Sequence, residues 1–84
     1  MATTKEEVKS RVMQIINNDV QQSLTMWLDT ILDSGVIDFD TEEDNWKLPK
    51  HIMVALGDKL SRSYTHYHPT KKDKAQIKNF SNLL

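Results

Sequence analysis

The charged side chains of this 84-residue chain are the ones best suited to chemistry, and the acidic and basic ones lie in different parts of the sequence. Residues 1–46 carry three cationic side chains and ten carboxylates, a net charge of −7. Residues 47–84 carry eight cationic side chains and two carboxylates, a net charge of +6, together with all three histidines. Charge segregation of this kind bears on binding partners and self-association more than on fold.

The basic candidate site lies on a helix predicted over residues 49–67. The charged positions on the side of this helix opposite its apolar face are His51, Lys59, Arg62 and His66. The last helix continues the charge with Lys71, Lys72, Lys74 and Lys78. Such a surface suits phosphate groups or an acidic protein, although a solvated helix face would produce the same pattern. The pI near 6.3 is low for a nucleic-acid-binding protein, so nucleic acid is the second hypothesis.

The acidic candidate site is the segment 38–44. Asp38, Asp40 and Glu42 alternate as the ligands of a calcium loop do. However, Glu43 stands where that loop requires glycine, and Pro49 takes the place of its final glutamate, which excludes an EF-hand. A solvated loop, or one that docks on a basic surface, fits the composition better.

Trp46 follows the acidic run directly. It either seals the core above the next helix or serves as an exposed anchor for a partner, because tryptophan is enriched in binding hot spots. The residues that we expect to contact a protein partner are Trp46, Asp40, Glu43, Lys59, Arg62 and His66.

Metal binding and catalysis have little support in the sequence. His66 and His68 could offer two imidazoles to zinc, but their spacing is not that of neighbouring helical turns and no third ligand is identifiable. The chain has no cysteine, no glycine-rich phosphate loop and no known hydrolase motif. We therefore expect no catalytic residue, no metal site and no cofactor.

The elements that must position these residues are helical, since the apolar residues recur with helical spacing almost throughout. Thr4 and Glu7 form a capping box for a helix over 4–17, whose apolar residues are Val8, Val12, Ile15 and Ile16. The apolar pattern then moves to a different face across Asn17 and Asn18, which favours a second helix over 19–33 that ends at Gly35. One continuous helix with two buried faces is the alternative.

The second half of the chain is predicted to contain two more helices. Pro49 starts the helix over 49–67, whose apolar face runs through Gly57 to Tyr64 and Tyr67. Because that face does not rotate at Gly57, we expect the glycine to mark a close helix crossing. Thr70 and Asp73 then cap a helix over 71–82, which has few apolar residues and could dock loosely.

Two carboxylates oppose the dipole of the helix over 19–33. Asp29 and Asp33 occupy its last turns, where negative charge is unfavourable. Pairing with His51 or Arg62 across a helix contact would explain them without a functional role.

The sequence as a whole predicts one all-α domain over residues 1–84, a compact bundle of about four helices with one long acidic loop. The first functional hypothesis is a non-enzymatic binding module that acts through protein–protein contact and self-associates. The N-terminus is polar, no apolar run is long enough for a membrane span, and cysteine is missing, so we expect a cytoplasmic protein with no membrane partner.

Overall fold

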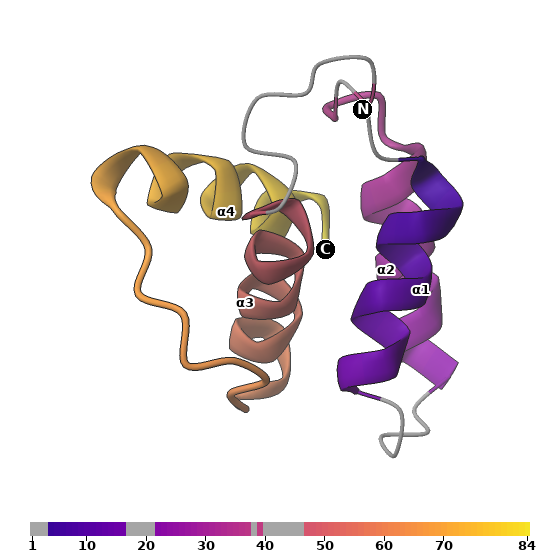
Figure 1. The fold of residues 1–84 in the computed structure, drawn as a ribbon, viewed down its shortest axis with the longest axis horizontal. Helices are drawn as coiled ribbons and strands as arrows, with labels where there is room; N and C mark the ends of the chain where they lie inside the picture. Colours follow the sequence, from indigo (N-terminus) through magenta and orange to yellow (C-terminus); the bar gives the residue numbers. More distant parts are fainter. Residues whose placement is uncertain (1–3, 17–21, 38, 40–46) are drawn as a thin grey trace.

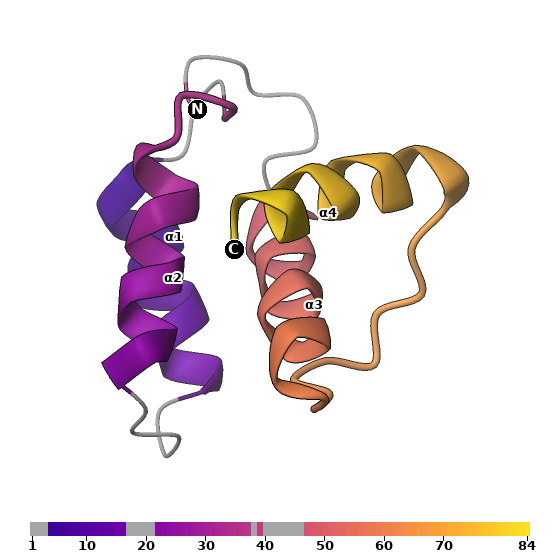
Figure 2. The same ribbon diagram turned by 180° about the vertical axis from the view of Figure 1, so that it is seen from behind.

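The computed structural model describes residues 4–16, 22–37, 39 and 47–84. Within these ranges the chain forms four helices and no strand: α1 (Lys5–Ile15), α2 (Gln22–Asp33), α3 (Leu48–Leu60) and α4 (Lys71–Leu83). Helices α1 and α2 lie antiparallel beside each other, α3 lies next to them, and α4 crosses over the first turns of α3 (Figures 1 and 2). The predicted all-α bundle is confirmed. No helix among the described residues is long and apolar enough to span a bilayer.

The first two helices are separate, as the change of apolar face predicted. Val8 and Val12 of α1 are fully buried, and so are Leu28 and Ile31 of α2. An antiparallel pair turns both apolar faces toward one core, which a single straight helix cannot do. The alternative of one continuous helix is therefore wrong.

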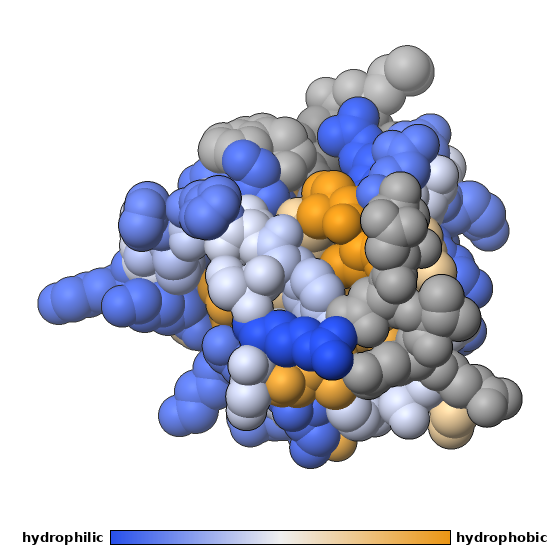
Figure 3. Space-filling view, turned by 90° about the horizontal axis from the view of Figure 1, so that it is seen from below, coloured by the Kyte–Doolittle hydropathy of each residue, from blue (hydrophilic) through white to orange (hydrophobic). Residues whose placement is uncertain are grey.

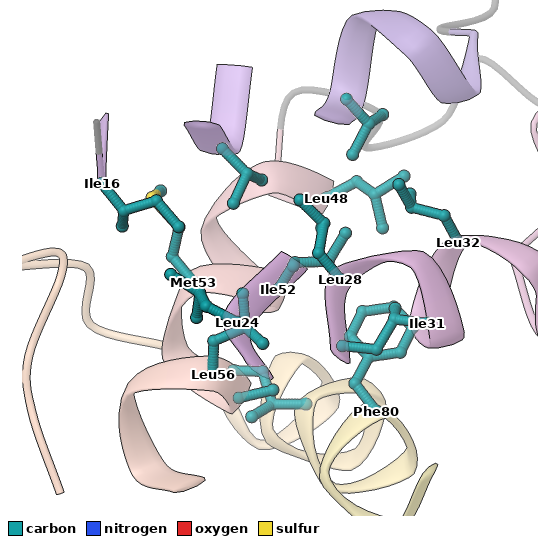
Figure 4. Packing of buried hydrophobic residues seen from close by; sticks show 14 residues of the cluster. Ile16, Leu24, Leu28, Ile31, Leu32, Leu48, Ile52, Met53, Leu56 and Phe80 are labelled. Atoms are coloured by element: carbon teal, nitrogen blue, oxygen red, sulfur yellow. The ribbon is translucent and has the colours of Figure 1, made fainter. Parts of the chain in front are cut away.

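One core connects all four helices, and Figure 4 shows its side chains converging from both halves of the molecule. Trp27 packs against this core and is partly buried. Ile15 was expected on the buried face of α1, yet 52% of it is exposed, whereas Ile16 is 3% exposed. Helical spacing does not distinguish the two, because Ile15 lies three residues after Val12 and Ile16 four residues after it. Ile16 is the C-cap residue of α1, where the backbone has left the helical conformation.

Helix α4 docks closely, contrary to the loose attachment that its few apolar residues allowed. Phe80 has no exposed surface and points into the core, and Ile77 is 6% exposed. The helix packs against both α3 and α2. Its predicted cap is confirmed, because Thr70 and Asp73 form a complete capping box.

Helix α3 ends at Leu60, so the helix predicted over 49–67 is too long. Ser61 adopts a left-handed conformation with φ of 55°. Its N–H donates to the Asp58 carbonyl at 3.3 Å and the Arg62 N–H donates to the Gly57 carbonyl at 2.8 Å, which together form a Schellman turn. Residues 62–70, here called the return segment, then run back outside α3 to the start of α4 (Figure 1).

The two tyrosines that extended the helical pattern lie on this return segment. Tyr64 packs against the core from there, and Tyr67 reaches the start of α4. Their spacing from the apolar residues of α3 is the same as in a continuing helix, but Tyr64 reaches the core and Tyr67 reaches Asp73 after the chain has reversed direction.

Gly57 is needed for this reversal and not for a crossing between helices. A Cβ atom at position 57 would lie 2.5 Å from the carbonyl oxygen of Arg62, which belongs to the backbone and cannot swing away. The predicted continuity of the helix through Gly57 is confirmed, and the predicted helix crossing there is wrong.

This turn offers a matched pair of substitutions with opposite expected effects. Gly57→Ala should destabilise the protein by about 1–3 kcal/mol, since the clash outweighs the gain of ~1 kcal/mol in helix propensity. Ser61→Gly should stabilise it by about 1 kcal/mol, because glycine has no penalty in the left-handed region. Urea denaturation followed by circular dichroism measures both. A stabilising Gly57→Ala would contradict the close approach.

Candidate functional site

A buried carboxylate joins α4 to the return segment. Asp73 is 5% exposed, and its Oδ2 accepts a hydrogen bond of 2.6 Å from the hydroxyl of Tyr67. The same oxygen accepts from the backbone N–H of Thr70 at 3.1 Å, and the Asp73 N–H donates to Thr70 Oγ1 at 3.2 Å. The capping box of α4 thus also holds the end of the return segment.

Helix α3 contributes the other side of this cluster. His51 is 7% exposed, and its Nε2 lies 3.4 Å from Asp73 Oδ1 and 3.4 Å from the Tyr67 hydroxyl. Lys47 Nζ lies 3.8 Å from Asp73 Oδ1. Lys50 Nζ stands 5.4 Å from the centroid of the Tyr67 ring, within range of a cation–π contact.

The hydrogen bonds determine the charge of this cluster. The pKa of Asp73 lies well below its ordinary value of 3.8. The main cause is the hydrogen bond from Tyr67, followed by the bond from the Thr70 backbone and the charge of Lys47, and burial acts in the opposite direction. Asp73 is therefore ionised at neutral pH, with cationic or hydrogen-bonding groups around it. Among the described residues, no buried side-chain nitrogen or oxygen lacks a hydrogen-bond partner. The arrangement suits holding three chain segments together more than reacting with a substrate.

A surface groove lies between α1, α3 and the return segment. Its apolar side chains include Ile15, Pro49 and Met53, and its edges carry Arg11 and Lys50. Its remaining lining residues are Gln14, Tyr64 and Thr65. None of these lining residues is acidic. Hydrophobic residues are visible among hydrophilic ones on the face seen from below, where α1 and α3 end (Figure 3).

The structure separates the residues predicted to contact a partner. Lys59 is exposed on α3, with its Nζ 5.9 Å from the centroid of the Trp27 ring. Arg62 and His66 are exposed, but they lie in the return segment and not on a helix. The predicted acidic contacts and their tryptophan lie outside the described residues: Asp40, Glu43 and Trp46.

His51 does not belong to that basic surface, and this prediction is wrong. It was placed opposite the apolar face of its helix, but it is buried against α4. The reason is that α3 has two partners. Helices α1 and α2 cover one side of it, and α4 with the return segment covers the side on which His51 lies.

The carboxylates at the end of α2 are paired, as predicted, but with other partners. Asp33 accepts a bond of 2.8 Å from Lys5, which raises the pKa of that lysine, and Asp29 lies 2.8 Å from Lys9. Both pairs link α2 to the neighbouring α1 and not to His51 or Arg62. They are largely exposed, so their contribution to stability is small.

Two features of the site were not predicted from the sequence: the contact between Tyr67 and Asp73, and the groove. Tyr67 and Asp73 are six residues apart on different elements, and no short-range pattern marks that contact. The groove had no signal in the sequence either, because the spacing of Ile15 from Val8 and Val12 is that of a buried residue.

Within the described ranges, no group of three or more histidine, aspartate or glutamate side chains is arranged to hold a metal ion. Comparisons with protein-family models, curated proteins and solved structures give no match for this chain. The described helices and the site together define a class: a small all-α protein with an internal polar cluster and a surface groove that is lined by apolar and cationic side chains.

Proposed function

We propose that this chain is a non-enzymatic binding module that recognises a segment of another protein in the groove between α1 and α3. The observation that carries the proposal is the exposure of Ile15, 52% of which faces solvent on the groove. A single exposed aliphatic side chain is common on protein surfaces, but one that lines a groove together with Pro49, Met53 and Tyr64 forms the kind of contiguous apolar surface that is typical of an interaction site. Because the chain has no cysteine to suffer reduction or oxidation, we expect the module to work in the cytoplasm.

The lining of the groove supports a partner of defined chemistry. Ile15, Met53 and Pro49 offer apolar surface, and methionine adapts to partners of different shape. Arg11 and Lys50 place positive charge beside that surface, and no acidic residue lines the groove. The partner segment should therefore carry apolar anchors next to carboxylates.

Selection from a displayed library of random peptides tests the proposal. Peptides that bind the wild-type chain should be enriched in aliphatic or aromatic residues flanked by aspartate or glutamate. Ile15→Glu should weaken the selected peptides at least tenfold in titration calorimetry, since it places a charge in the apolar floor. Met26→Glu is the matched control, because Met26 is 64% exposed on α2 and does not line the groove. It should change affinity less than twofold.

Two results would count against this function. One is a library that yields no peptide whose binding depends on Ile15. The other is equal weakening by Ile15→Glu and Met26→Glu, which would indicate nonspecific adhesion. Sedimentation of the free chain at 0.05 and 0.5 M salt tests whether a second copy fills the groove instead, in which case Ile15→Glu should give a monomer.

A further inference from the structure

The outer face of α4 is cationic. Helical spacing places Lys71, Lys74 and Lys78 in one row, and each of these lysines is exposed. The row extends about 10 Å along the helix at 1.5 Å per residue. Arg62 of the return segment and Lys72 of α4 are exposed as well.

The tertiary structure makes this surface more positive than the sequence suggests. Asp73 is the only carboxylate between residues 59 and 78, and it is buried in the cluster with Tyr67 and His51. Its negative charge faces Tyr67, Lys47 and His51 inside the protein. The exposed side chains of this stretch therefore include six cationic residues and no carboxylate: Lys59, Arg62, Lys71, Lys72, Lys74 and Lys78.

The composition of this face favours a phosphate backbone over a protein. Protein interfaces need an apolar or aromatic centre and are depleted of lysine. The large exposed hydrophobic residues of the described chain are Ile15, Met26 and Val36, and none of them belongs to α4. Nucleic-acid backbones are bound mainly by lysine and arginine and require no apolar anchor.

We propose that the lysine row of α4 binds the phosphate backbone of a nucleic acid without sequence preference. Each lysine contacts one phosphate, and the pairing releases condensed counterions. Lys74 and Lys78 also line a groove between α3 and α4, whose other lining residues are Val54, Asp58, Pro69, Ile77 and Ser81. Asp58 limits the affinity for phosphate because of its negative charge. This surface lies on other residues than the peptide groove, so either function can fail without the other.

Fluorescence anisotropy with labelled 20-nucleotide single strands and duplexes of mixed sequence tests the proposal. At 50 mM salt we expect micromolar binding. Three phosphate contacts on duplex DNA predict a salt slope near −2.7, or a loss of about 40-fold between 50 and 200 mM salt. The triple variant Lys71→Gln, Lys74→Gln, Lys78→Gln should lose at least tenfold in affinity and most of that slope. Asp58→Asn should bind about two to five times more tightly.

Two matched controls separate the row from net charge. Replacing the same three lysines with arginine should keep the affinity, because the charge remains. The triple variant Ser10→Glu, Ser23→Glu, Thr30→Glu changes the net charge equally on exposed positions of α1 and α2, and it should bind within threefold of wild type.

Three outcomes would overturn the proposal. The first is no salt-sensitive binding to either nucleic acid at 50 mM salt with 100 µM protein. The second is equal loss of affinity in the glutamine and glutamate triple variants. The third is tighter binding of polyglutamate than of nucleic acid, which would identify an acidic protein as the partner of this face. Circular dichroism of each variant excludes loss of fold as the cause.

Discussion

Truncation of Phe80 to alanine is expected to destabilise the domain by about 3–5 kcal/mol. Phe80 has no exposed surface and points from α4 into the core shared with α2 and α3 (Figure 4). A domain of this length has a total stability of roughly 4–13 kcal/mol, so the variant should be partly unfolded at 37 °C. Urea denaturation followed by both circular dichroism and tryptophan fluorescence measures the loss.

Leu83→Ala is the control for this prediction, since Leu83 lies on the same helix but is only partly buried. It should cost about 1–2 kcal/mol, because less surface is removed from the core. The two probes should report one transition in each variant, because α4 packs against both α2 and α3. A Phe80→Ala chain that loses helix content at low urea while its tryptophan fluorescence stays native would show that α4 is a separable unit.

Replacing Asp73 with alanine should have the second largest effect, a fall in melting temperature of about 10 °C or more. The substitution removes the acceptor for Tyr67 and for the Thr70 N–H, and it removes the charge that faces His51 and Lys47. Removing one member of a buried network takes an interaction from each of the others, which costs more than the network contributes when complete. Tyr67→Phe should lower the melting temperature less, because Asp73 keeps its other partners.

The pH dependence of stability provides an independent test of this carboxylate. The pKa of Asp73 is lower in the folded chain than its ordinary 3.8, so its contribution is fully present above pH 3.8 and is lost as the pH falls below that value. Asp73→Asn removes this dependence. Thermal melts between pH 2 and 5 should therefore show the gap between wild type and Asp73→Asn narrowing as the pH falls below about 4.

Asp58→Asn serves as the control for these melts, since Asp58 is exposed on α3. Its melting temperature should follow that of the wild type at every pH. If the gap between wild type and Asp73→Asn stayed constant down to pH 2, the stabilising role of the ionised Asp73 would be excluded.

The local features of this protein follow from its sequence. The capping residues Thr4 and Thr70 start α1 and α4 where predicted, and Gly35 adopts the positive φ of 80° expected after α2. The separation of α1 from α2 was also predictable, because the change of apolar face is a property of neighbouring residues. Caps, turns and helical faces depend on interactions between residues that are close in the sequence, so these features can be predicted from it.

The tertiary structure decided where charges and aromatic rings lie. His51 was predicted to lie opposite the apolar face of its helix, but the crossing of α4 over α3 buries it together with Asp73. The end of α3 could not be predicted because Tyr64 packs against the core and Tyr67 contacts Asp73 after the chain reverses at Ser61, so both tyrosines extend the apolar spacing of the helix. The physical reason is that burial depends on which surfaces meet across long sequence separations. Apolar periodicity identifies one buried face of each helix, but it does not show which of the other faces is covered by a neighbouring element.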